Sequence, residues 1–158
     1  MYDCDVVVVG GGLIGCAAAY YLAGLGQRVT VVEAGQIGAG ASGRNAGSLH
    51  FQLEFRLLQH QDQLGSQIAH LVPLTKRAIE HWRGLEVELG EDLELMMHGG
   101  LMVAETPEQR EVLIRKCEFE NRLGMELELI EGSRLRAMAP YLADSVIAAL
   151  HCADEGHC

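Results

Sequence analysis

A group of glycines near the amino terminus gives the clearest indication of a chemical function. Gly10-Gly11-Gly12-Leu13-Ile14-Gly15 fits the pattern GxGxxG. In this pattern Gly10 permits a tight turn, Gly12 lets a pyrophosphate approach the backbone, and Gly15 lets a helix pack closely on a sheet. Glu33 follows 18 residues after the last glycine. A carboxylate there can accept hydrogen bonds from both ribose hydroxyls of an adenosine, so the spacing predicts a dinucleotide site rather than a structural glycine turn.

A second segment of small residues follows Glu33. Residues 39–47 combine small side chains with the hydroxyl of Ser42, the guanidinium of Arg44 and the amide of Asn45. Small residues allow a long prosthetic group to lie against the backbone, and Ser42 and Arg44 can bind pyrophosphate oxygens. A flexible surface loop with an incidental arginine is the alternative. Because nicotinamide enzymes do not need such a loop, the segment favours FAD over NAD.

The elements that must position these residues form a βαβ unit. Residues 4–9 are apolar and β-branched, which predicts a strand buried on both faces of a parallel sheet. Residues 13–25 predict a helix ended by Gly26, and residues 28–33 predict a second strand reached by a right-handed crossover. Two strands and one helix leave apolar edges exposed, so we expect further elements to cover them.

The rest of the chain changes character. The predicted fold class is α/β: a Rossmann-like βαβ unit with an incomplete parallel sheet, followed by the start of an α+β substrate domain. We expect divisions at residues 1–50, 51–145 and 146–158, the last being a strand that returns toward the first division. The predicted elements are a helix over 71–89 with Pro73 tolerated only in its first turn, a hairpin of 93–97 and 101–104, a helix over 107–123 capped by Thr106 and Gln109, a strand over 125–130, a short helix over 133–138 and a last strand over 146–152.

Composition limits the class of protein. The 158 residues are 49% apolar and 22% charged, an ordinary globular balance. The formal net charge of -10 argues against nucleic-acid binding, since the phosphate backbone would be repelled. Eleven of the 19 glycines fall within the first 47 residues, which carry only five charged side chains. This asymmetry predicts a specialised amino-terminal unit followed by a more conventional domain.

Cysteine usage and hydropathy predict a cytoplasmic protein without a transmembrane segment. Five cysteines with no CxxC pair indicate reduced thiols. Residues 6–25 carry no charge, but no basic residue precedes them and glycines interrupt them, unlike a signal peptide or a membrane span. His151-Cys152 and His157-Cys158 suggest zinc ligands, but both pairs lie in the last eight residues without a scaffold. We therefore expect no metal.

The motifs together resemble the D-amino acid oxidase-like FAD-dependent oxidoreductases. The resemblance is carried by residues 6–15, Val31–Ala34 and Gly40–Gly47. It continues more loosely through Trp82, Gly99-Gly100-Leu101, Gly124, Pro140 and residues 154–157. This family includes glycine oxidase, sarcosine oxidase and bacterial amino acid dehydrogenases, and the likeness extends to opine-oxidase and hydrogen-cyanide-synthase subunits.

The resemblance implies a set of FAD contacts. The residues that it places against the cofactor are Gly10, Gly11, Gly12, Leu13, Ile14, Gly15, Glu33, Ala34, Ser42, Gly43, Arg44, Asn45, Ala46 and Gly47. Among these, Glu33 would bind the adenosine ribose, and the segment from Ser42 to Gly47 would line the pyrophosphate and ribityl chain. His50 and Gln52 follow closely and are weaker candidates for the flavin ring or substrate. No catalytic side chain is identified.

The implied activity is oxidation of the C–N bond of an amino acid or secondary amine, with hydride transfer to flavin N5 and an imine product. Family members are more than twice as long as this chain, so we expect an amino-terminal portion of a longer enzyme, or a subunit completed by another chain. An electron-transfer partner would place such an enzyme at the periphery of the inner membrane. The alternatives are a stand-alone dinucleotide-binding or interaction subunit and a fragment of an NAD-dependent dehydrogenase.

Overall fold

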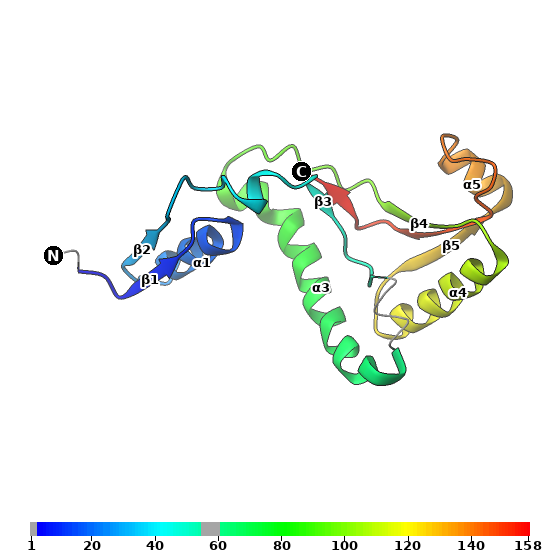
Figure 1. Cartoon of the computed structure of the whole chain (residues 1–158), viewed down its shortest axis with the longest axis horizontal. Coiled ribbons are helices and arrows are strands. Elements are labelled where there is room, and N and C mark those ends of the chain that lie inside the picture. Colours follow the sequence, from blue (N-terminus) through cyan, green and yellow to red (C-terminus); the bar gives the residue numbers. More distant parts are fainter. Residues whose placement is uncertain (1–2, 55–60) are drawn as a thin grey trace. The chain divides into compact units, whose positions relative to one another are not determined.

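The chain forms two compact units, Met1–Ala46 and Gly47–Cys158, in the computed structural model (Figure 1). The structure describes residues 3–54 and 61–158; within α3, the side chains of residues 61–66 and 68 are outside this description. The architecture is mixed α/β, as the sequence predicts, with a small parallel sheet in the first unit.

The first unit is a βαβ unit with a loop after its second strand. Its elements are β1 (Val6–Val9), α1 (Leu13–Gly24), β2 (Val29–Val32) and the short 3-10 helix η1 (Ala41–Gly43). The strands are parallel, with Val6 opposite Val29 and Val9 opposite Val32. Gly26, at a φ of 83°, ends α1 because only glycine adopts this left-handed conformation without cost.

The first unit buries little apolar surface. Within its described residues, 3–46, no apolar side chain is fully buried. The prediction that β1 is buried on both faces is wrong for this chain, since Val7 is 53% and Val9 is 86% exposed. The reason is physical: one helix and one neighbouring strand leave the rest of β1 to solvent, whereas a parallel sheet is normally covered on both faces.

The second unit is built on a three-stranded antiparallel sheet in the order β4-β6-β5 (Figure 1). Its elements are β3 (Ser48–Leu49), α3 (Gln61–Leu89), β4 (Gly100–Ala104), α4 (Pro107–Arg122), β5 (Leu127–Glu131), α5 (Gly132–Met138), β6 (Ala148–Cys152) and β7 (Gly156–His157). Leu150 on the central strand lies opposite Met102 on one side and Leu129 on the other. The two short strands β3 and β7 pair separately and are antiparallel.

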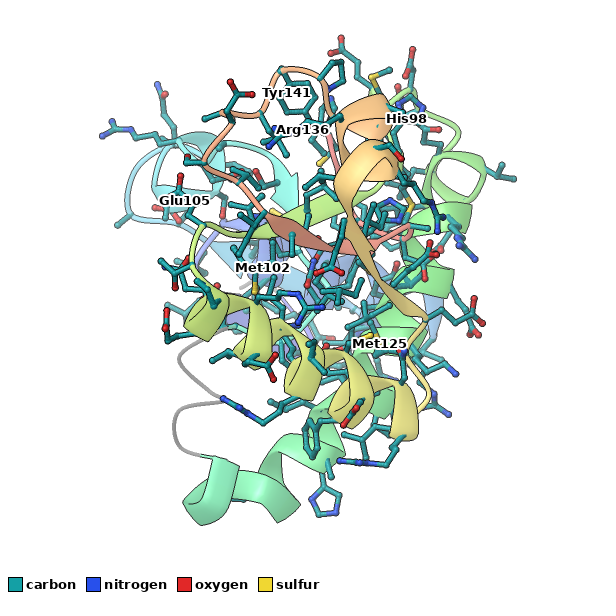
Figure 2. All side chains as sticks on the ribbon, turned by 90° about the vertical axis from the view of Figure 1, so that its right-hand side faces the viewer. His98, Met102, Glu105, Met125, Arg136 and Tyr141 are labelled. Atoms are coloured by element: carbon teal, nitrogen blue, oxygen red, sulfur yellow. The ribbon has the colours of Figure 1, made fainter. Side chains whose placement is uncertain are left out.

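Helices pack on both faces of this sheet. Leu113 of α4 and Ile79 of α3 belong to one apolar cluster with Leu150. On the opposite face, Leu135 of α5 clusters with Ala149. Figure 2 shows α4 beside the strand that carries Met102. The alternation of Ala149 and Leu150 between the two clusters follows from the two-residue period of a strand.

The predicted hairpin of 93–97 and 101–104 is wrong. β4 forms, but its partner is β6, and only Met96 of the earlier segment makes a bridge, with His157. Met96 N donates to His157 O at 2.9 Å, and His157 N donates to Met96 O at 3.0 Å. Two pairings compete for β4: the local one across the turn at Gly99 and the distant one with β6. Four of the five residues of β6 are buried, so pairing with β6 buries more apolar surface.

The position of Pro73 also differs from the prediction. The helix begins at Gln61, so Pro73 lies in the interior of α3 rather than in its first turn. Proline there removes one backbone hydrogen bond. Val72 and Ile79 are buried in the core, and their packing offsets that loss.

The start of α4 agrees with the sequence. Thr106 Oγ1 accepts from Gln109 N at 3.3 Å, and Gln109 Oε1 accepts from Thr106 N at 3.3 Å. These two bonds form the predicted capping box, with Pro107 at the first helical position.

Candidate functional site

The glycine turn of the first unit holds β1, α1 and β2 close together. Gly10 has a φ of 106°, and its N–H donates to Val32 O at 2.8 Å. A Cβ added at Gly15 would overlap the carbonyl oxygen of Gly10. The chain therefore passes directly from β1 into α1.

The N-terminus of α1 faces a serine hydroxyl. Gly12 is the N-cap residue and supplies no side-chain cap. Instead, Leu13 N donates to Ser42 Oγ at 2.9 Å, and a Cβ added at Gly12 would lie 3.1 Å from the same oxygen. The first N–H groups of a helix carry a partial positive charge, so this end of α1 suits a phosphate group.

Glu33 follows β2 and turns back onto the glycine segment. Its Oε2 accepts from Gly11 N at 2.7 Å, and its Oε1 accepts from Gly35 N at 2.8 Å. These hydrogen bonds, that from Gly11 first, lower the pKa of Glu33, so the side chain is ionised at neutral pH. The N–H of Ala34 also donates to this carboxylate, which has about four acceptor positions, so acceptor capacity remains for a sugar hydroxyl.

The loop after Glu33 contains further predicted cofactor residues. Asn45 Nδ2 donates to Ser42 O at 2.7 Å. A Cβ added at Gly43 would overlap the carbonyl oxygen of Gly38, so the loop is tightly folded there. The predicted cofactor residues that lie in the first unit are Gly10, Gly11, Gly12, Leu13, Ile14, Gly15, Glu33, Ala34, Ser42, Gly43, Arg44, Asn45 and Ala46.

Gly47 is the remaining predicted cofactor residue and lies in the second unit. Its φ is 68°, its carbonyl oxygen accepts from Cys158 N at 3.0 Å, and a Cβ there would overlap Cys158 O. Close backbone approach therefore explains this glycine within the second unit.

The second unit contains a cavity of about 410 Å³. His50 and Gln52, the two weaker candidates from the sequence, both line it. The other lining residues are Glu54, Gly100, Leu101, Met102, Val103, Gln109, Leu113 and Glu155. A lining that combines apolar side chains with a few polar groups is typical of a small-molecule site.

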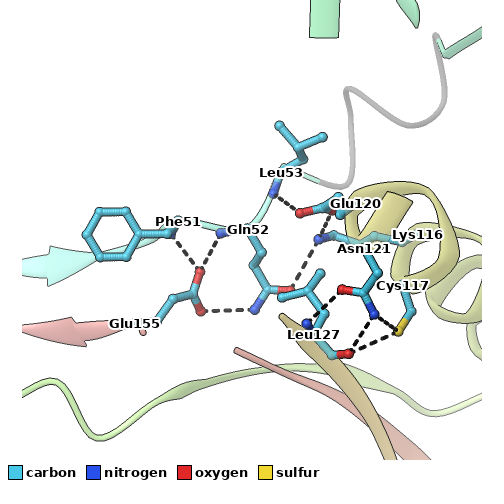
Figure 3. Close-up of polar contacts among 9 residues, drawn as sticks. All are labelled: Phe51, Gln52, Leu53, Lys116, Cys117, Glu120, Asn121, Leu127 and Glu155. Carbon is cyan, nitrogen blue, oxygen red and sulfur yellow. Dashed lines mark hydrogen bonds and ion pairs between the residues drawn. The ribbon is translucent and has the colours of Figure 1, made fainter. Parts of the chain in front are cut away.

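A buried polar network lies beside this cavity (Figure 3). It joins Gln52, Lys116, Glu120 and Glu155, whose exposed fractions are 9%, 1%, 0% and 2%. Sequence reasoning missed the last three. Residues 154–157 contribute to the resemblance to the family, but no local pattern connects Glu155 with Phe51, 104 positions earlier.

Two kinds of feature are absent from the part of the chain that the structure describes. Over residues 3–54 and 61–158, no group of three or more His, Cys, Asp or Glu side chains is placed to hold a metal ion. Across the same ranges, no helix is long and apolar enough to cross a membrane.

The first unit defines a class of protein. A glycine turn between a strand and a helix N-terminus, with an ionised carboxylate after the next parallel strand, is the arrangement of a dinucleotide-binding fold. The sequence model described as "FAD dependent oxidoreductase" matches residues 5–158. The chain therefore belongs to this family, whose cofactor is FAD.

Known proteins resemble this chain along nearly all of its length. Glycine oxidase of Geobacillus kaustophilus is 31% identical over 144 residues, which are 91% of this chain and 37% of the relative. Its crystal structure has a TM-score of 0.82, at 29% identity, and covers 99% of this chain and 41% of that one. L-proline dehydrogenase from P. horikoshii has a TM-score of 0.80, at 28% identity, over 98% of this chain and 38% of that one.

A third relative is named for a substrate that is not an amino acid. Subunit A1 of the anaerobic glycerol-3-phosphate dehydrogenase of Haloferax volcanii is 32% identical over 150 residues, which are 95% of this chain and 23% of the subunit. The chain therefore spans well under half the length of the proteins that it matches.

Proposed function

We propose that this chain is the FAD-binding portion of an oxidoreductase that oxidises the C–N bond of an amino acid or secondary amine. The observation that carries the proposal is the similarity to glycine oxidase in both sequence and structure, along more than nine tenths of the chain. The likeness to L-proline dehydrogenase supports the same substrate class.

The proposed cofactor contacts follow from the geometry of the first unit. The glycine turn leads into the N-terminus of α1, whose N-cap residue Gly12 has no side chain, and this suits the pyrophosphate of FAD. Glu33 would accept a hydrogen bond from the ribose with its remaining acceptor capacity. Ser42 and Arg44 would bind phosphate oxygens, and the small residues from Gly43 to Gly47 would let the cofactor lie along the backbone.

The cavity of the second unit is the proposed location of part of the substrate. Its volume of about 410 Å³ is within the range of small-molecule sites. His50, Gln52 and Glu54 are polar residues that line it, and Met102 is an apolar one. When bound, the flavin would accept the hydride from the carbon beside the amine nitrogen, leaving an imine that water hydrolyses.

We also propose that further polypeptide covers the first unit in the active enzyme. Val9 and Ile14 are each 86% exposed, and the two-stranded sheet has open edges. Exposed strands of this composition are usually paired or covered. The covering elements would come from a later part of a longer protein or from another chain.

Oxidation of glycerol 3-phosphate is the second candidate, because subunit A1 is 32% identical to this chain. The charges around the cavity disfavour it. Glu54 and Glu155 both line the space, and carboxylates repel a phosphate dianion more strongly than a zwitterionic amino acid, whose ammonium group they attract.

The test is anaerobic reduction of the flavin in the purified protein, together with any polypeptide that completes it. Glycine, sarcosine, L-proline and glycerol 3-phosphate are added separately, and the flavin absorbance at about 450 nm is recorded. We expect at least one amine to bleach the flavin and glycerol 3-phosphate to leave it oxidised. Dithionite serves as the control for bound flavin. Bleaching by glycerol 3-phosphate alone would favour the second candidate.

A further inference from the structure

Residues 50–54 form an extended segment between the cavity and the core. His50, Gln52 and Glu54 line the cavity, whereas Phe51 and Leu53 are buried in the apolar cluster. This two-residue alternation is that of a β-strand. The segment follows β3, and its backbone hydrogen bonds are made to side chains rather than to a strand.

Two carboxylates accept three consecutive N–H groups of this segment (Figure 3). Glu155 Oε1 accepts from Phe51 N at 2.8 Å and from Gln52 N at 3.0 Å. Glu120 Oε2 accepts from Leu53 N at 3.0 Å. Charge-assisted hydrogen bonds of this kind are stronger than those between neutral groups, so they fix the backbone from 51 to 53.

Gln52 and Lys116 join the two carboxylates into one network. Gln52 Nε2 donates to Glu155 Oε2 at 2.9 Å, and Lys116 Nζ donates to Gln52 Oε1 at 3.2 Å. Lys116 also forms an ion pair with Glu120. The orientation of the Gln52 amide is therefore determined at both ends: its donor faces a carboxylate and its acceptor faces an ammonium.

Glu155 is itself held firmly. A Cβ added at Gly100 would overlap its carboxylate, so the side chain packs directly on the backbone at the start of β4. Gly99 N donates to Glu155 O at 2.8 Å. The carboxylate thus connects β4, which lines the cavity, with the segment that contains His50 and Gln52.

Burial makes this network costly as a source of stability. Burial lowers the pKa of Lys116 and raises the pKa of Glu120, and their ion pair opposes both effects. Buried ion pairs are often no more stabilising than apolar residues of the same volume. A network with this cost is better explained by the conformation that it imposes.

We propose that Glu155 is a positioning residue for substrate binding: it fixes the backbone of Phe51 and Gln52, and thereby the part of the cavity lining that His50 and Gln52 form. The inference rests on the proposed function, because it takes the cavity as the place of the amine. It adds a specific role for a side chain that the sequence reasoning did not identify.

The test is Glu155→Gln in the complete holoenzyme. A glutamine can accept the two backbone N–H groups only by turning its amide donor toward Gln52 Nε2, which is also a donor. If the Gln52 amide then rotates, its donor meets Lys116 Nζ, a third donor. The substitution therefore removes no volume but creates a mismatch throughout the network. Glu131→Gln is the matched control, because Glu131 pairs with Arg110 outside the cavity lining.

The first measurement is hydrogen exchange of the backbone amides of residues 51–53 without substrate. We expect exchange at least about tenfold faster in Glu155→Gln than in Glu131→Gln, from the loss of charge-assisted hydrogen bonds. If Glu155→Gln fails to fold, Glu155→Asp replaces it, since its shorter side chain keeps the charge but cannot make all three bonds. Unchanged exchange in the folded variant would overturn the proposal.

The second measurement separates KM from kcat, using whichever compound reduces the flavin. We expect Glu155→Gln to raise KM by about tenfold while kcat changes by less than about threefold, and Glu155→Asp to raise KM by less. Equal KM values in Glu155→Gln and Glu131→Gln would overturn the positioning role. Failure of every amine to reduce the flavin would instead contradict the proposed function, and the exchange result would still stand.

Discussion

The contact between Gly15 and the Gly10 carbonyl is the tightest requirement of the glycine turn. At Gly15 a side chain would meet backbone, which cannot move without displacing α1 from β1. At Gly24, in the same helix, no heavy atom lies within 4 Å of an added Cβ. The two glycines therefore differ in the room available for a side chain, although both lie in α1.

This difference gives a prediction with its own control. We expect Gly15→Ala to cost about 1–3 kcal/mol through overpacking and to weaken FAD binding by about tenfold or more. Gly24→Ala should bind FAD normally and gain up to about 1 kcal/mol from helix propensity. Titration of the apoprotein with FAD, followed by flavin fluorescence, measures both. Equal affinities in the two variants would show that the turn tolerates a methyl group.

The site residues that could be predicted from sequence are those with local spacing. Glu33 and the glycine turn lie within one βαβ unit, so a pattern of about 20 residues contains the whole arrangement. Glu155 and Phe51 are 104 positions apart. Nothing in the sequence near either residue shows that a buried carboxylate replaces a strand partner, so only the fold could bring them together.

At the scale of elements, Arg136 connects α5 with the loop that leads to β6 (Figure 2). Its guanidinium donates to four backbone carbonyls of the loop, those of Leu142, Ala143, Asp144 and Val146, at 2.7–3.3 Å. Four acceptors arranged around one planar group match the fork of arginine and not the point charge of lysine.

We therefore expect Arg136→Lys to lower the free energy of unfolding of the second unit by about 2 kcal/mol. Arg134→Lys is the control, since Arg134 makes an exposed ion pair with Glu128 and should lose less than about 1 kcal/mol. Urea unfolding followed by the fluorescence of Trp82, the single tryptophan, measures the change in the second unit. Equal losses would mean that the carbonyl contacts of Arg136 add nothing.

Local signals predicted some elements and long-range packing decided others. The capping box of Thr106 and Gln109 lies within four residues, and α4 begins where it predicts. The wrong hairpin and the interior Pro73 have the opposite origin. In both cases, the free energy gained by burying apolar residues against distant segments exceeds the local preference of a turn or a proline.

At the scale of the whole molecule, the two units differ in how they are stabilised. Both apolar clusters of the described residues belong to the second unit, where Leu113 and Leu150 are no more than 2% exposed. The first unit has a sheet of two strands, and such a sheet with one helix is marginal by itself. The proposed cofactor and covering polypeptide would therefore supply much of its stability.

Amide exchange measures this dependence directly. In the 158-residue chain without FAD, we expect the amides of β1 and β2 to exchange at least about a hundredfold faster than those of β5 and β6, because few buried contacts oppose local opening. FAD together with the covering polypeptide should slow exchange in β1 and β2 toward the rates of β5 and β6, since a ligand bound only to the folded state adds stability. Gly15→Ala should remove much of the slowing of exchange that FAD causes in β1 and β2, while leaving exchange in β5 and β6 unchanged. Slow exchange in β1 without FAD or a partner would contradict both the need for cover and the proposal that rests on it.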